Sequence, residues 1–496
     1  MDIRFGDDRV NPVLIKELRQ AFHNRLMLSL SGILLVLQFA VLVIFNLLKS
    51  EWINSSSGGG SLFVGIDAVL MNLCILIVCA YGPLQRFTAE RSSSELDFAA
   101  ITLLTPFQII FGKLVCALVT ALLIASLCLP FMTVAYFFRN VTLLEIAGIF
   151  ISEIVPVLLT AQLALFCGAL GKKWGQALFL VIFLQGAGPM FIGAPVLFNT
   201  AVLKGSSEQF LFWGMQLGGV LVFSLLFVST TALITPRFAN RMFLPRLLGM
   251  VCVVLFCCIA FIPGVLRGLS GGSGQAFREM FLFCCPVLLT VFLVLLAVCD
   301  RDEPGARVLS QTPRHFPGRL CHFLLSSNRT GGVLCLLLAL ALFVVGAAAM
   351  RAWDAHTLWA IMAAAGVCGY LVFYGECAVL LSRLTPKVSG WVWLLIVGAF
   401  FGAMCPLLAD GTRLKLDDIF VSPLQLTGLR VGDFASRRAS ILPDLSPSLL
   451  RVCIGPALAM LPGIWFLIEG CRKFRTWRAP EPIPAEKEKG EGIVKR

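Results

Sequence analysis

The chain has 496 residues, of which 58% are hydrophobic and only 14% are charged. A soluble domain carries about 25% charged residues, so the composition excludes an ordinary soluble protein. The formal net charge of +12 suggests nucleic acid as a partner, but the basic residues lie in short segments between long apolar runs. That distribution is typical of membrane topology, so we expect no nucleic-acid binding.

Twelve apolar runs reach or approach the roughly 20 residues that a helix needs to cross a bilayer. Backbone polar groups must find partners within the chain in lipid, and the runs are too long for barrel strands. We therefore expect an all-α polytopic membrane protein with about twelve transmembrane helices. The expected spans are 27–48, 62–83, 114–138, 143–170, 177–199, 210–234, 247–266, 280–299, 331–350, 357–382, 391–409 and 449–469.

The Lys and Arg residues favour one side of the expected membrane. If the N-terminus is cytoplasmic, the inner segments hold 28 of the 40 Lys and Arg residues. Five of the other 12 lie in a single long outer loop, residues 410–448. Short loops therefore follow the positive-inside rule, which predicts that both termini are cytoplasmic. We expect a multi-pass protein of the plasma (inner) membrane.

An amphipathic helix is predicted before the first span, within residues 1–26. Asn11 can cap this helix, and Pro12 suits its first position. Apolar residues then recur at every fourth position, with basic and polar residues between them. This pattern favours an elbow helix in the membrane interface, although an ordinary helix packed on the protein has the same pattern. The stripe comprises Leu14, Leu18, Phe22 and Leu26.

A charged, partly apolar stretch, residues 90–115, separates the second and third expected spans. Ser92 and Glu95 have capping-box spacing, which predicts a helix that starts near Ser93. Thr105 and Gln108 form a second capping box with Pro106 at the first helical position, so another helix starts there. That helix continues through the third span to residue 138, about 50 Å in all. The stripe of the first helix comprises Leu96, Ala100, Leu103 and Phe107.

Two further segments have unusual composition. The fifth expected span contains three glycines and two prolines between residues 186 and 195, which predicts a kinked or re-entrant segment that lines protein or water. Residues 471–496 are rich in charge and contain proline, which predicts a disordered cytoplasmic tail.

The sequences NPVLIKELRQ and ERSSSELDFAAITLLTPFQIIFGKLV together resemble permease subunits of ABC transporters of the type-2 export class. The resemblance covers about residues 10–235. In that family the loop between spans two and three carries a coupling helix, which docks on a separate ATPase subunit. The matching residues here are Glu90, Arg91, Glu95, Leu96, Leu103, Leu104, Thr105, Pro106, Gly112 and Lys113.

The resemblance implies a six-span permease core at residues 27–235, after the elbow at residues 1–26. Residues 236–470 then form a second six-span region, either a degenerate repeat or an added domain, which exceeds the family's usual subunit. The family implies three kinds of partner: a cytoplasmic ABC ATPase subunit, membrane lipids, and a second copy or second permease subunit. ATP is then bound by the ATPase, and this chain binds no cofactor directly.

Motifs of catalysis are missing from the sequence. No GxxxxGK[ST] loop, HExxH motif or GxSxG motif occurs, and none of the four histidines has an evident catalytic partner. We therefore expect neither enzyme activity nor a metal site on this chain. Three ionisable residues inside spans are candidates for a substrate path or proton relay, or for ties between helices. They are Glu153, Asp67 and Glu376.

Two other functions compete with an ABC exporter that moves its substrate across the plasma membrane. A secondary transporter is expected to have paired buried charges and two comparable halves, which the sequence does not visibly contain. An enzyme acting on lipid-linked substrates at the outer face could use the charged loop 410–448. A solvated cap over the outer mouth is the simpler interpretation of that loop.

Overall fold

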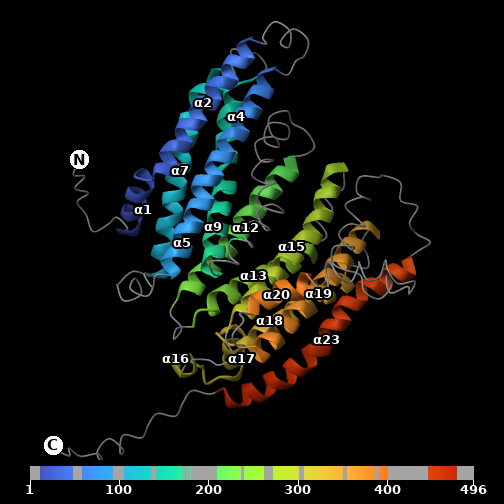
Figure 1. Ribbon diagram of the computed structural model, residues 1–496. Helices are drawn as coiled ribbons and strands as arrows, with labels where there is room; N and C mark the ends of the chain where they lie inside the picture. Colours follow the sequence, from blue (N-terminus) through green and yellow to red (C-terminus); the bar gives the residue numbers. More distant parts are fainter. Residues whose placement is uncertain are drawn as a thin grey trace, which may run out of the picture. The chain divides into compact units, whose positions relative to one another are not determined.

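The computed structural model describes residues 12–47, 59–92, 105–134, 136, 141–170, 176, 179, 209–235, 240–261, 272–300, 306–349, 355–385, 390–399 and 445–477. These residues form helices and no strands (Figure 1). Seven of the described helices are long and apolar enough to cross a membrane, and a bent helix pair adds an eighth if it forms one span. The all-α class with several membrane-length helices is confirmed, whereas the count of twelve spans stays a prediction.

The chain divides into two compact units, of which unit 1 is Met1–Thr235 with Ile262–Phe281, and unit 2 is Pro236–Phe261 with Leu282–Arg496. The sequence analysis also divides the chain after residue 235, but it assigns 262–281 to the second region. The described helices of unit 1 include α1 (Pro12–Phe22), α2 (Arg25–Leu47), α4 (Gly59–Leu76), α5 (Gly82–Ser92), α7 (Pro106–Val134), α8 (Leu143–Ser152), α9 (Ile154–Leu170) and α12 (Gln209–Ile234).

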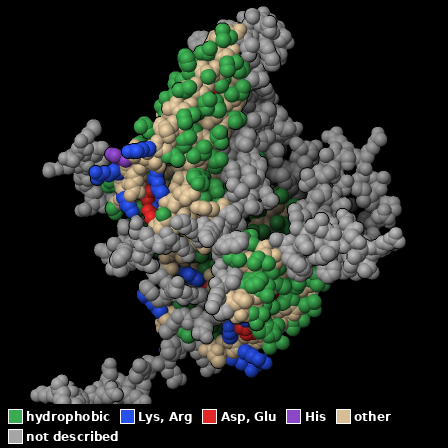
Figure 2. All heavy atoms as spheres, in the orientation of Figure 1, with side chains coloured by type: hydrophobic (Ala, Val, Ile, Leu, Met, Phe, Trp, Pro, Cys, Tyr) green, Lys and Arg blue, Asp and Glu red, His purple; other side chains and the backbone are tan. Residues whose placement is uncertain are grey.

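The core of unit 1 lies where α4, α7 and α9 pack together, and it contains Phe63, Ile124 and Leu165. By contrast, α2 exposes most of its apolar side chains, among them Leu28 and Val36. Figure 2 shows hydrophobic side chains as a band over this part of unit 1, with charged side chains gathered at one end of the band. An apolar outer surface of this kind is what lipid contact requires.

The start of α7 confirms the predicted capping box. The Thr105 hydroxyl accepts a hydrogen bond from the Gln108 amide at 3.3 Å, and the Gln108 side chain accepts one from the Thr105 amide at 2.9 Å. Pro106 is the first residue of the helix, where its missing N–H costs nothing. The helix ends at Val134 instead of residue 138, and its 29 residues measure about 43 Å, longer than the bilayer core.

The helix of the second span extends beyond its expected end at residue 83. A π-helical turn, Ile77–Tyr81, joins α4 to α5, and the helix continues to Ser92. The widened turn accommodates Pro83, because a proline inside a helix lacks a donor and crowds the preceding turn. Ser92, predicted to take part in the capping box of the next helix, is the last residue of α5. The helix expected to start near Ser93 lies outside the described residues.

The fourth span is broken at Glu153. A capping box of Thr142 and Glu145 starts α8, which ends at Ser152, and α9 begins at Ile154. Pro156 cannot donate to the carbonyl of Ser152, four residues earlier. The side chain of Gln216, from α12, donates to that carbonyl instead, at 3.1 Å. The break is thus stabilised by a neighbouring helix.

Unit 2 contains a sharp turn between two helices. The short helix α17 and the apolar helix α18 meet at 98°, and Asn328 caps the start of α18 by accepting from the Thr330 amide at 3.2 Å. The described helices of unit 2 are α13 (Phe243–Phe261), the part of α15 (Gly272–Cys299) after Phe281, α16 (Ala306–Ser310), α17 (Phe316–Leu325), α18 (Arg329–Ala349), α19 (Ala355–Leu384), α20 (Gly390–Ala399) and α23 (Leu445–Thr476).

Residues 471–476, expected to belong to a disordered tail, are helical. Helix α23 continues to Thr476, and Trp477 is buried, because Phe474 and Trp477 pack against Phe323. Three other expectations lie largely outside the described residues: the fifth span at 177–199, the outer loop 410–448, of which residues 445–448 already belong to α23, and the rest of the tail.

Candidate functional site

A buried ion cluster lies where α1, α5 and α7 meet in unit 1. Lys113 of α7 is 6% exposed and binds two carboxylates from the other helices. One is Glu17 of α1, which is 7% exposed, and the other is Glu90 of α5, at 2.9 Å. The Lys16 ammonium lies 3.9 Å from the Glu90 carboxylate. A buried lysine shared by two acids ties three helices together.

The aromatic ring of Phe87 also contacts Lys113, whose ammonium lies over the ring at 5.6 Å from its centroid. A cavity of about 30 Å³ adjoins the cluster, and its lining includes Glu17, Arg86 and Thr120. This volume has room for about two water molecules. The charged groups of the cluster are thus largely buried beside a space large enough for water.

Helix α1, the predicted elbow helix, contacts the rest of unit 1 through a face other than its apolar stripe. Its buried residues are Glu17 and Ala21, which face α7, so the predicted stripe is not the packing surface. Of that stripe, Leu14 and Leu18 are half-buried, and Phe22 is 53% exposed. The remaining predicted elbow residue, Pro12, is exposed at the start of the helix. The sequence analysis missed Glu17 because its charge fits equally well on a solvated face.

The predicted coupling residues fall into four groups. Glu90 belongs to the ion cluster, and Thr105 and Pro106 form the cap of α7. Arg91 lies in α5, although its side chain is outside the description. The other four, Glu95, Leu96, Leu103 and Leu104, are outside the described residues. The structure therefore joins the two ends of the predicted coupling stretch to the elbow helix through Glu90 and Lys113.

Two of the three predicted pathway residues are buried inside unit 1. Glu153, at the break between α8 and α9, is 4% exposed and accepts a hydrogen bond from Asn72 of α4 at 2.9 Å. Its second carboxylate oxygen has no hydrogen-bond partner among the described residues. Asp67, five residues before Asn72 on α4, is fully buried, and neither of its oxygens has a partner there. The sequence analysis missed Asn72.

The third predicted pathway residue, Glu376, lies in unit 2. It belongs to α19, is fully buried, and has no hydrogen-bond partner among the described residues. Gly463 of α23 faces it, and a Cβ atom at that glycine would lie 3.3 Å from the carboxylate. The glycine thus lets α23 approach the Glu376 side chain closely.

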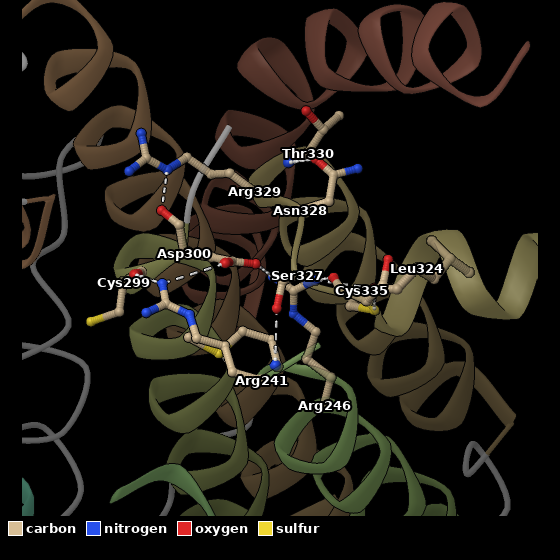
Figure 3. A network of polar contacts seen from close by, with 12 residues as sticks. Arg241, Arg246, Cys299, Asp300, Leu324, Ser327, Asn328, Arg329, Thr330 and Cys335 are labelled. Carbon is tan, nitrogen blue, oxygen red and sulfur yellow. Dashed lines mark hydrogen bonds and ion pairs between the residues drawn. The ribbon is translucent and has the colours of Figure 1, made fainter. Parts of the chain in front are cut away.

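A larger polar network holds one end of unit 2 together, as shown in Figure 3. The fully buried Asp300, after the end of α15, binds Arg246 of α13 at 2.6 Å and lies 3.8 Å from Arg241. Arg246 also donates to the carbonyls of Leu324 and Ser326, where α17 ends. These carbonyls have no partner within their own helix, so a buried arginine caps them.

Two further interactions extend this network to α19 and α23. Arg329 donates to the Asp300 carbonyl at 2.9 Å and to Ser382 at 3.1 Å. Glu469 binds Arg383 and Lys473, each at 2.8 Å. The charged groups of this network are thus engaged in pairs that hold helix ends together.

No family model, curated protein or solved structure matches the chain.

Proposed function

We propose that the protein is the membrane-spanning permease subunit of an ABC exporter, driven by a separate cytoplasmic ATPase subunit. The observation that supports this proposal most is the cluster of Lys113, Glu90 and Glu17. The resemblance assigns Glu90 and Lys113 to the two ends of the coupling stretch and Glu17 to the elbow helix. Direct ion pairs join all three. When the ATPase displaces the coupling stretch, these ion pairs transmit the movement to the elbow helix and to α7.

The buried carboxyls Asp67 and Glu153 supply a polar interior beside α7 and α9. Charged groups inside a membrane protein are costly, and they usually face an interior path instead of lipid. In this proposal they contact the substrate during export, while ATP hydrolysis on the partner supplies the energy. The ATPase docks on residues 93–104, with Glu95 and Asp97 facing its basic residues.

The test is capture of the ATPase with the full-length permease in mild detergent, followed by identification of its GxxxxGK[ST] motif. The variant is Glu95→Lys with Asp97→Lys, which avoids Glu90 because that residue holds Lys113 inside the protein. Like charges that face each other cost several kcal/mol, so we expect recovery of the ATPase to fall at least tenfold.

The matched control is Glu486→Lys with Glu488→Lys, which makes the same charge change near the C-terminus. We expect it to leave recovery of the ATPase unchanged. Equal recovery with both variants, or no ATPase with the wild type, contradicts the proposal.

A secondary transporter is the second candidate, because Asp67, Glu153 and Glu376 are buried carboxyls of the kind that ion-coupled carriers use. Reconstitution separates the two functions. Purified protein that moves substrate in vesicles under an ion gradient, without an ATPase, favours this second candidate. Transport that requires ATP and the captured ATPase favours the first.

A further inference from the structure

Helix α17 presents two different faces. One face is buried in unit 2, where Phe323 lies 5.1 Å from the Trp477 ring, and Trp477 donates to His322 at 3.2 Å. The C-terminal end of α23 thus holds α17 in place. The described residues cover the opposite face only in part: the Phe316 ring lies 5.7 Å from the Phe474 ring, yet Phe316 is 63% exposed and Leu320 is 39% exposed.

The exposed side chains of this face are apolar. Phe316 and Leu320, one helical turn apart, are exposed, and Cys321 is exposed beside them, whereas Leu324 packs against the buried cluster of Phe323 and Trp477. The helix has only 10 residues, about 15 Å, so it is too short to cross a membrane. It meets the membrane-length helix α18 at 98°, so α17 lies crosswise to a span. An amphipathic helix in this setting is typical of the membrane interface.

The charges around this face all have one sign. Residues 306–329 contain four arginines and two histidines, and no aspartate or glutamate. Arg314 is exposed just before the helix. The Arg319 guanidinium lies 4.6 Å from the Phe474 ring centroid, beside the exposed ring of Phe316. Basic groups beside an exposed apolar face complement the phosphates of anionic lipids.

We propose that α17 is an anionic-phospholipid-binding helix that lies in the inner membrane interface. Phe316, Leu320 and Cys321 contact acyl chains, while Arg314 and Arg319 contact lipid phosphates. A lipid surface fits this face, because its exposed side chains are apolar, the charges beside it are basic, and the apolar helix α18 follows directly after the turn. The proposal does not depend on the ATPase or on the substrate.

The experiment places a photocrosslinker on the apolar face, with Leu320→p-benzoylphenylalanine in the full-length protein. The protein is reconstituted in nanodiscs of phosphatidylcholine and phosphatidylglycerol in equal amounts, and adducts are identified by mass spectrometry. We expect phospholipid adducts, with phosphatidylglycerol in excess. The control is Gln311→p-benzoylphenylalanine, at an exposed polar position before the helix, which should give few lipid adducts.

The charge requirement is tested by Arg314→Gln in the crosslinking background. One basic residue near an anionic surface contributes about 1 kcal/mol, so the excess of phosphatidylglycerol should fall about fivefold. Arg314→Lys keeps the charge and should keep the excess. An adduct to a co-purified ATPase, no adduct at all, or an excess unchanged by Arg314→Gln would each overturn the proposal.

Discussion

At the scale of single residues, the pair of Asn72 and Glu153 connects α4 to the break in the fourth span. The amide of Asn72 donates to one carboxylate oxygen of Glu153, and the other oxygen has no partner among the described residues. One side chain therefore forms a tie between helices and keeps one carboxylate oxygen without a partner among the described residues. Variants that change these oxygens separately distinguish the contributions of the two oxygens.

We expect Glu153→Gln to leave the thermal stability of the protein unchanged, because the amide oxygen still accepts from Asn72. Glu153→Leu leaves the buried Asn72 donor without that acceptor, which costs about 1–3 kcal/mol. The double variant Asn72→Leu with Glu153→Leu removes both partners of the hydrogen bond. Its loss of stability should therefore be smaller than the sum of the losses in the two single variants. The measurement is thermal unfolding in detergent, followed by size-exclusion chromatography. If the stability losses of the two single variants simply add in the double variant, the hydrogen bond between Asn72 and Glu153 does not tie the helices.

At the scale of helices, elements with strong local signals could be predicted from the sequence. Thr105, Pro106 and Gln108 fix the start of α7, because a capping box and an N-terminal proline depend only on neighbours in the chain. The burial of Glu17 could not be predicted, because it depends on Lys113, which lies 96 residues away. Likewise, the end of α23 is helical because Trp477 and Phe323 pack together, and composition alone indicates a tail there.

The joint of α1, α5 and α7 gives a prediction about stability. Lys113→Met leaves the buried carboxylate of Glu17 without a partner, which typically costs about 3–5 kcal/mol. For a unit of this size, that loss lowers the melting temperature by about 6–20 °C. Adding Glu17→Gln removes the unpaired charge and should restore part of the loss. The measurement is again thermal unfolding in detergent.

The matched control for this joint is Arg86→Met, which removes a basic residue that lines the same cavity. Arg86 has no ion pair among the described residues, so its loss should leave the melting temperature within a few degrees of the wild type. An equal effect of Lys113→Met and Arg86→Met would mean that net charge, and not the ion cluster, holds the joint together.

At the scale of the whole molecule, the contacts within each unit agree with the expected alternation of spans. In unit 2 the network joins the start of α13, the end of α15 and the end of α19, through Arg246, Asp300 and Ser382. Each of these helix ends is expected on the inner side. In unit 1 the ends that meet at Lys113 are likewise all expected on the inner side. Each unit is thus consistent with one orientation of its own spans.

Both units should share that orientation, with the joined ends in the cytoplasm, because the basic segments of both follow the positive-inside rule. Alkaline phosphatase is active only outside the cytoplasm, and green fluorescent protein fluoresces when fused inside, so paired fusions report the side of each position. We expect outer-side signals after Gly58, Gly205, Gly272 and Asp433, and inner-side signals after Arg91, Arg237, Pro313 and Glu488. Opposite results for one adjacent pair of positions would refute the twelve-span count. Opposite results at all positions from Gly272 onward would place the second unit in the reverse orientation, with α17 on the outer leaflet.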